Sequence, residues 1–564
     1  MMEMNSRFLL VDEALPLCRS PRRSSTPESL TMVAVVLRSR RSALLLLLLL
    51  LVLLLILPPA NQQPTMPVCD QAGRRGAANN ANDHATETRG SVRTMTLTME
   101  TSPAAVLEVD DEVATGGTGK ASRHGLDDIL QEFESWCSSV NLELSPKVVL
   151  SEDGLVDRYG LQAVENISEG EVLFSVPRDA LLSSVTTSIS QVLEKEAASL
   201  KSQSGWVALI VALMYEFTCP NSRWKPYLAL CPEPDQLDLP MFWPEEERKR
   251  LLRGTGVPEA VHLDLENIEL EFNSVVQPFL AAHPTLFDSK QHTLNLYKRM
   301  VAFVMAYSFQ EPLEEEDEDE KDPNPPIMVP MADILNHVSN HNANLEFTKD
   351  CLKMISTRPI AKGEEVYNTY GDLANWQLLH MYGFVEPHPA NNNDAAEIQM
   401  TTLYKAALQV FGESRKQLVE KKWKVLCEML LVGEEGAFVI GREGVLTEEE
   451  LYAALKVLCM SEDELEDYQE NEGWEEDDAA DESLTNEAIV ELHPMWRTLL
   501  AESIRLTLAA YGPVQKEDEA MLADPVLSAK LSRRERYALN LRCGQTSILQ
   551  NLLRLTEGQL MAQV

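Results

Sequence analysis

Two clusters of polar residues lie within otherwise core-like sequence between residues 327 and 384. The first, residues 333–337, reads Asp-Ile-Leu-Asn-His and closes a short apolar segment. The second, residues 367–371, reads Tyr-Asn-Thr-Tyr-Gly and follows an expected strand. Carboxylate, amide, imidazole and phenol groups in such a setting could ligate a metal ion or bind and orient a ligand. We therefore expect the functional site here.

A metal site is the first possibility that the spacing raises. Asp333, His337 and His341 stand four residues apart, which would place three ligands on one face of a helix. However, the segment lacks the glutamate of a zinc-protease helix, and its Asn-rich continuation favours turns over helix. The sequence therefore predicts no metal at this position.

The elements that must position these residues belong to a chain of 564 residues, long enough for two or three domains. Residues 140–390 read as short strands, including 148–150, after a helix over 126–136. The phrase Ile-x-x-Gly-Glu followed by an apolar strand occurs twice, at 167–174 and 360–367. Glycine turns that feed short strands predict a domain of several small sheets.

Helical patterns interrupt this β region between residues 186 and 325. They cover 207–215, 244–253, 265–283 and 292–309, and Pro278 should kink or end the third of them early. From 398 to 556 every pattern is helical, with 401–431 as one long helix. Thr447 and Ser532 each precede a glutamate by three residues, the spacing of a capping box. The predicted fold is α+β, with an all-helical C-terminal domain.

The net charge of −39 is concentrated. Residues 311–322 and 462–482 together hold 22 acidic residues and one lysine, a composition typical of solvated, disordered loops. Such acidity makes direct nucleic-acid binding improbable and basic peptide segments suitable partners, since opposite charges speed encounter. A role in solubility alone explains the charge equally well.

Residues 1–125 are predicted to be a low-complexity extension without structural role. Its leucine-rich segment, 43–57, has fifteen apolar residues, fewer than the roughly 20 that span a membrane, so we expect no membrane association. The nine cysteines are scattered and form no C-x-x-C pair. This pattern favours reduced thiols, and hence the cytosol or nucleus.

Taken in order, these features resemble the SET-domain methyltransferases related to the Rubisco lysine methyltransferase of plants. The resemblance rests on the repeated Gly-Glu strand, the inserted helices, Asn336-His337, the Asn-x-Tyr-Gly motif of 368–371 and the helical C-terminal region. It covers about 140–555 and implies a SET domain, an S-adenosylmethionine cofactor and transfer of a methyl group to a protein lysine, without metal.

The resemblance also implies roles for individual residues. Tyr370 is the expected catalytic tyrosine, whereas by itself it could equally pack a turn. The expected cofactor-binding residues are Asp157, Arg158, Tyr159, Tyr307, Asn336, His337 and Tyr382. The expected acceptor-binding residues are Trp206, Gln310 and Asp333. Without the resemblance, Tyr307, Tyr382 and Trp206 would be interpreted as ordinary core aromatics.

The resemblance further implies localisation to the nucleus, with the cytoplasm as a second location, and acceptors such as histones and a transcription-factor subunit of the NF-κB type. Two alternatives stay open at this point. Some relatives methylate histidine, so the acceptor could be an imidazole. The chain could also be a scaffold that recruits partners through its acidic segments, although the intact Asn-His and Asn-x-Tyr-Gly motifs disfavour that interpretation.

Overall fold

The computed structural model describes residues 123–151, 159–202, 204–313, 323–470, 483–512 and 515–558. All of them fall within one compact unit, residues 119–564. The leucine-rich segment and the rest of the N-terminal extension lie outside these residues. So do Asp157 and Arg158, two of the predicted cofactor-binding residues.

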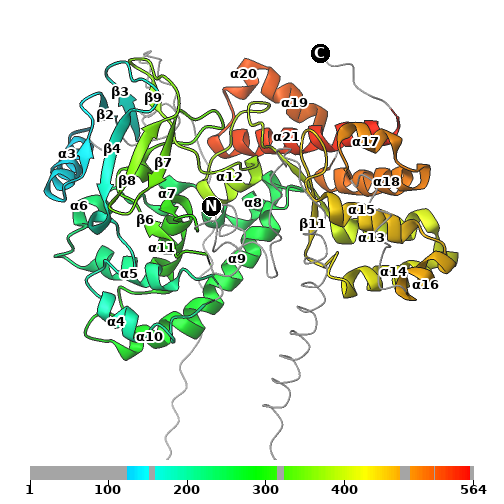
Figure 1. The fold of residues 1–564 in the computed structure, drawn as a ribbon, viewed down its shortest axis with the longest axis horizontal. Coiled ribbons are helices and arrows are strands. Elements are labelled where there is room, and N and C mark those ends of the chain that lie inside the picture. Colours follow the sequence, from blue (N-terminus) through cyan, green and yellow to red (C-terminus); the bar gives the residue numbers. More distant parts are fainter. Residues whose placement is uncertain are drawn as a thin grey trace, which may run out of the picture. The chain divides into compact units, whose positions relative to one another are not determined.

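Three small antiparallel sheets form the β part, as predicted (Figure 1). The four-stranded sheet has the order β1-β4-β8-β7, the three-stranded sheet the order β2-β3-β9, and β5 pairs with β6. Their bounds are β1 Glu143–Leu144, β2 Val148–Ser151, β3 Gly160–Ala163, β4 Val172–Pro177, β5 Ser308–Phe309, β6 Ile327–Met328, β7 Ala343–Phe347, β8 Cys351–Ser356 and β9 Glu365–Val366.

The two copies of the repeated Gly-Glu phrase pair with each other and form similar turns. Ile167 and Ile360 form an antiparallel bridge, with N–H···O distances of 2.9 and 3.0 Å. Gly170 and Gly363, three residues later in each copy, both adopt positive φ (81° and 91°), a conformation that glycine reaches without steric cost. The two copies therefore turn the chain in the same way and fix one sheet against the next.

The helical insertion is present and leads from β4 to β5. It contains α4 Ser190–Lys195, α5 Val207–Thr218, α6 Lys225–Leu228, α7 Pro234–Leu237, α8 Glu245–Leu251, α9 Val257–Glu271, α10 Gln277–Ala282 and α11 Leu294–Tyr307. The interruption expected at Pro278 occurs as a π-helical segment, Phe272–Val276, immediately before α10. Proline has no N–H to donate, and the wider π turn carries the chain past it.

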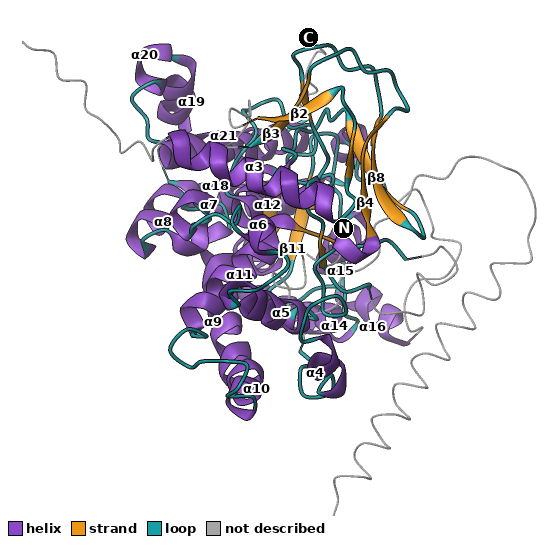
Figure 2. Ribbon diagram, turned by 90° about the vertical axis from the view of Figure 1, so that its left-hand side faces the viewer, coloured by secondary structure: helices purple, strands orange, loops and turns teal. Residues whose placement is uncertain are grey.

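The region after residue 395 is mainly helical, with one correction (Figure 2). Strands β10 Ala396–Gln399 and β11 Ala437–Ile440 form a two-stranded antiparallel sheet, so the region is not all-helical. The helices are α13 Met400–Phe411, α14 Lys416–Glu428, α15 Glu448–Cys459, α16 Glu462–Glu470, α17 Asn486–Glu491, α18 Pro494–Tyr511, α19 Gln515–Ala523, α20 Pro525–Ser528 and α21 Arg533–Thr556. Before this region come α3 Arg123–Ser139 and α12 Asn375–Tyr382.

Of three local predictions in this region, two are wrong and one is confirmed, each for an identifiable reason. The pattern 401–431 is two helices, because Gly412 adopts a positive φ of 73° and ends α13. Thr447 does not cap α15, since its hydroxyl accepts from Val439 N (3.0 Å) and so ties the helix to β11. Ser532 and Glu535 form the expected capping box of α21.

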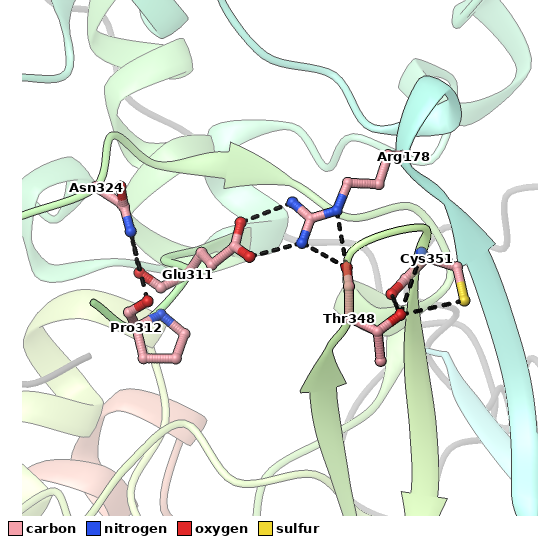
Figure 3. Close-up of polar contacts among 6 residues, drawn as sticks. All are labelled: Arg178, Glu311, Pro312, Asn324, Thr348 and Cys351. Carbon is pink, nitrogen blue, oxygen red and sulfur yellow. Dashed lines mark hydrogen bonds and ion pairs between the residues drawn. The ribbon is translucent and has the colours of Figure 1, made fainter. Parts of the chain in front are cut away.

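The acidic segments are more ordered than predicted where the structure describes them. Residues 462–470 form α16, which buries Leu465 and Tyr468. Figure 3 shows that Arg178 donates to both carboxylate oxygens of Glu311, at 2.6 and 2.7 Å, and to Thr348 O. This ion pair lowers the pKa of the Glu311 carboxyl. Glu311 is thus paired with Arg178, which also binds the β7–β8 turn, and is not a self-repelling charge.

Two hydrophobic cores hold the described residues together. The first is built from residues between 130 and 385 together with Ala538 and Leu541, and the second from residues between 396 and 555. Helix α21 belongs to both, because Ala538 and Leu541 enter the first core while Leu549 and Leu552 enter the second. The helix therefore couples the two cores.

Within the described part, no helix is both long and apolar enough to cross a bilayer. The same residues hold no group of three His, Cys, Asp or Glu side chains arranged to bind a metal ion. The cysteines in this part are free thiols.

Candidate functional site

The segment after β6 brings the first polar cluster into position through an unusual backbone conformation. Met331 is buried with φ of 78°, an outlier for a bulky residue that costs about 1–3 kcal/mol and is typical of functional sites. A single 3-10 turn, Ala332–Ile334, follows and then an extended stretch. The helical stripe of Asp333, His337 and His341 therefore does not form.

The second cluster lies directly beside the first. His337 and Asn368 form a parallel bridge, and Asn368 N donates to Asn336 O at 2.9 Å. Tyr370 N donates to His337 Nδ1 at 3.0 Å. The phenol of Tyr370 then turns back and donates to Leu335 O at 2.9 Å. Two segments more than thirty residues apart thus hold the Tyr370 hydroxyl at a defined point.

Aromatic rings pack around the ring of Tyr370. The Tyr370 ring stacks between His337 and Tyr382, with centroid distances of 5.1 and 4.7 Å. Phe384 meets Tyr370 edge-on at 6.3 Å. Such contacts each contribute about 0.5–1.5 kcal/mol beyond the area they bury, so they restrict the ring to one orientation.

The imidazole of His337 is neutral in this setting. Burial lowers its pKa to about 4, because the charged form loses hydration. A neutral ring with Nδ1 accepting from Tyr370 N carries its proton on Nε2. His337 is therefore a fixed hydrogen-bond acceptor and stacking partner above about pH 5.

The Asn336 side chain links the residue that precedes β3 to a residue of β9. Its Nδ2 donates to Tyr159 O at 2.8 Å and to Glu365 Oε1 at 2.6 Å. An amide nitrogen has two hydrogens, so both donors of this group are committed. The side chain thereby fixes Tyr159, an expected cofactor-binding residue that directly precedes β3, while its other partner, Glu365, is buried.

Asp333 has a buried carboxyl group, and only one of its two oxygens is hydrogen-bonded. Oδ2 accepts from Tyr227 Oη at 2.6 Å, whereas Oδ1 has no hydrogen-bond partner. Burial raises the pKa of this carboxyl to about 7, and the hydrogen bond from Tyr227 opposes the rise. Asp333 thus changes charge near neutral pH and can accept a proton or pair with a cation.

These groups surround one cavity of about 290 Å³. Aromatic residues are the most numerous in its lining, which also contains one carboxyl, the side-chain amides of Gln236 and Asn336, and one guanidinium. The lining residues are Tyr159, Tyr227, Leu230, Cys231, Pro232, Gln236, Phe303, Ala306, Tyr307, Asp333, Ile334, Asn336, Tyr370, Tyr382, Phe384 and Arg533.

Most of the predicted site residues meet here. Six of them line the cavity, and His337 supports Tyr370 from behind. Two do not reach it. Trp206 is 1 % exposed at the start of α5 and packs in the first core. Gln310 donates from Nε2 to Asn324 O at 2.6 Å, beside the acidic segment.

Sequence reasoning missed ten of the sixteen lining residues, Tyr227, Gln236, Phe384 and Arg533 among them. Tyr227 and Gln236 come from the helical insertion, and Arg533 comes from α21, so no local spacing pointed to them. Phe384 stands two residues after Tyr382, at the end of the stretch 327–384 that holds both polar clusters, and its aromatic type was the available signal.

Gly383 sets the path from Tyr382 to Phe384, and we predict that Gly383→Ala is strongly destabilising. It ends α12 at φ of 77°, and a Cβ there would lie 2.3 Å from Leu237 O of α7. We expect a loss of more than about 2 kcal/mol in the free energy of unfolding, from backbone strain plus a forced shift of α7. Urea denaturation of the purified chain measures it.

Gly170→Ala is the matched control for this substitution. Gly170 has a similar φ of 81°, but nothing lies within 4 Å of its added Cβ. Only the left-handed backbone should then be penalised, by about 1–2 kcal/mol. Equal losses at the two glycines would show that the contact with α7 is unimportant.

Comparison with known proteins gives concordant matches. The family model described as "SET domain" matches residues 158–371, and "Rubisco LSMT substrate-binding" matches residues 413–549. "N-lysine methyltransferase setd6" of Salmo salar is 56 % identical over 435 residues, covering 76 % of this chain and 97 % of the relative. "N-lysine methyltransferase SETD6" of Homo sapiens is 53 % identical over 449 residues, covering 75 % and 95 %.

Solved structures agree at the level of fold. "Crystal structure of the SET domain of LSMT bound to Lysine and AdoHcy" superposes with a TM-score of 0.54 at 20 % identity, covering 77 % of this chain and 91 % of that one. "Structure of Rubisco LSMT bound to AdoMet" superposes with the same TM-score and covers 76 % and 91 %.

Proposed function

Because this chain belongs to the SET-domain N-lysine methyltransferases with a Rubisco LSMT substrate-binding domain, we propose that its aromatic cavity is the methyl-transfer site. The protein is an S-adenosylmethionine-dependent protein-lysine N-methyltransferase. The observation that carries the assignment of the site is the Tyr370 side chain, whose hydroxyl donates to Leu335 O and whose ring stacks with His337 and Tyr382.

The residues present suit this cofactor. Its sulfonium needs electron-rich surroundings, which the faces of Tyr370, Tyr382 and Phe384 provide. Its adenine needs flat apolar contact, and its amino-acid end needs charged or polar partners. When bound, S-adenosylmethionine supplies an activated methyl group. Tyr159 and Asn336 are the residues on the cavity wall that would hold it.

The cavity residues can also prepare the acceptor. An ammonium has no lone pair, so the lysine must lose a proton before it can attack. A channel lined by Tyr227, Phe303 and Tyr307 removes water and thereby lowers the pKa of an entering amine. Asp333 Oδ1 can accept a hydrogen bond or a proton from that amine. The Tyr370 hydroxyl then orients the neutral amine. Holding the amine in the correct geometry for attack supplies much of the rate acceleration.

We further propose that the acceptors are nuclear proteins that carry the target lysine in a basic segment, histones and a transcription-factor subunit of the NF-κB type among them. The net charge of −39 supports this, since an acidic surface speeds encounter with basic segments. Nuclear residence rests on the family resemblance and on a chain whose described cysteines are free thiols.

Incubation of the purified chain with methyl-labelled S-adenosylmethionine tests this function. The acceptors would be core histones, the NF-κB subunit and, as a control, an acidic protein of similar size. We expect label on the basic acceptors alone, and mass spectrometry should place it on lysine. Label on histidine would overturn the lysine assignment, whereas cofactor binding without transfer would overturn only the choice of acceptors.

A further inference from the structure

Arg533 differs from the other residues of the cavity in its origin. It is the first residue of α21, within the region that matches the Rubisco LSMT substrate-binding model. The other cavity-lining residues in the described chain lie between Tyr159 and Phe384. The C-terminal region therefore contributes a side chain to the site that the SET domain builds.

The start of α21 is fixed against the helical insertion. Arg534, the next residue, pairs with Asp238 and Glu247, each at 2.7 Å. Its guanidinium also lies over the ring of Trp243, 5.0 Å from the centroid. Asp238 directly follows Leu237, whose carbonyl faces Gly383. These contacts hold the backbone of Arg533 beside the α7–α12 junction, where Tyr382 and Phe384 enter the cavity.

The Arg533 side chain is itself oriented by a neighbour. Its Nε donates to Tyr537 Oη at 3.0 Å, and its guanidinium lies 5.4 Å from the Tyr537 ring centroid. One turn of helix thus orients the guanidinium, and Arg533, although exposed, contributes to the lining of the cavity.

The charge of Arg533 gives the cavity a polarity. Among the lining residues that the structure describes, Arg533 alone is a permanent cation, and Asp333 alone is a carboxyl. An amine acceptor is complementary to Asp333. A ligand carboxylate is complementary to Arg533, because guanidinium and carboxylate form strong, charge-assisted hydrogen bonds.

We propose that Arg533 binds the carboxylate of the methionine part of S-adenosylmethionine, so that the C-terminal region completes the cofactor site. The inference rests on the proposed function. The cofactor is favoured as the source of the carboxylate because acceptors with basic flanks would be repelled by Arg533. Arg533 also lines the same cavity as Tyr382 and Phe384, whose rings pack against each other and against Tyr370, which supports the same choice.

Calorimetric titration of the full chain with S-adenosylmethionine tests this. Arg533→Ala should weaken binding by about 10- to 100-fold, the usual value of a hydrogen-bonded charge pair, and Arg533→Lys by less. Arg536→Ala is the matched control, an exposed arginine one turn along α21 that does not line the cavity. It should leave the affinity unchanged.

A decarboxylated analogue of the cofactor makes the test specific. The wild type should bind it as weakly as Arg533→Ala binds the intact cofactor, and Arg533→Ala should bind both ligands alike. Equal affinity of wild type and Arg533→Ala for the intact cofactor would overturn the inference. If Arg533→Ala instead raised only the KM of an acceptor with an acidic flank, the carboxylate would belong to the acceptor and the cofactor assignment would be wrong. Failure of the wild type to bind S-adenosylmethionine would overturn the proposed function itself.

Discussion

Tyr370→Phe should lower kcat for lysine methylation by about 10²- to 10⁴-fold, the range for loss of a group that acts on the transferred proton or the transition-state charge. The substitution removes only the hydroxyl that donates to Leu335 O. The ring contacts with His337 and Tyr382 remain, so the shape of the cavity persists. Cofactor affinity should therefore change by no more than a few-fold, and stability by about 1 kcal/mol.

Steady-state kinetics together with cofactor titration measures both expectations. Tyr367→Phe is the matched control, since Tyr367 precedes Tyr370 by three residues and does not line the cavity. Its kcat should stay within about threefold of the wild type, because no reacting group is lost. If Tyr370→Phe retained such a rate as well, the hydroxyl would have no catalytic role and the proposed site would be wrong.

Asp333→Asn should stabilise the protein at alkaline pH while slowing methylation. Burial raises the pKa of the Asp333 carboxyl from 3.8 to about 7 in the folded state. Between these values the unfolded chain has released its proton and the folded protein has kept it. The free energy of unfolding therefore falls as pH rises through this window, and the full penalty applies above about pH 7.

Asparagine does not titrate, so the variant escapes this penalty. The gain in the free energy of unfolding should be absent near pH 4 and reach a few kcal/mol at pH 8, at about 1.4 kcal/mol per pKa unit. Urea denaturation at pH 5, 6, 7 and 8 gives the comparison. A gain that does not depend on pH would mean that the Asp333 carboxyl is not the titrating group. His337 does not compete as an explanation, since its pKa of about 4 lies below this range.

The same variant should lose activity. Without a carboxylate beside the channel, an entering ammonium has neither an ionic partner nor a proton acceptor at Asp333. We expect kcat/KM to fall by roughly tenfold or more, and the rise of kcat/KM with pH near 7 to disappear. Higher stability with lower activity would identify Asp333 as a residue kept for function at a cost in folding free energy.

The two motifs around Tyr370 could be predicted because each is a continuous phrase with a recognisable family pattern. Their mutual contact followed from the resemblance, and the bridge between His337 and Asn368 agrees with it. The SET domain and lysine as the acceptor type are likewise confirmed by the comparisons, and the inserted helices are present in the structure.

Other features depend on contacts that no local pattern contains. Tyr227 reaches Asp333 across 106 residues, and α21 brings Arg533 to the cavity from the far end of the helical region. Thr447 has the residue type and spacing of a helix cap, but its hydroxyl accepts a hydrogen bond from Val439 N of β11 instead. In each case tertiary packing decides which of several locally reasonable partners a side chain takes.

Helix α21, shared by both cores, has a consequence for how the enzyme matures during translation. The strands and rings of the cavity leave the ribosome first, and Arg533 follows roughly 150 residues later, on the order of ten seconds at usual elongation rates. Until then the hydrophobic surface that later packs against Ala538 and Leu541 is exposed to solvent. Such a surface is prone to aggregation and is the kind that chaperones bind. A nascent SET domain should therefore stay inactive on the ribosome, and no methyl group should be transferred before the second core has closed.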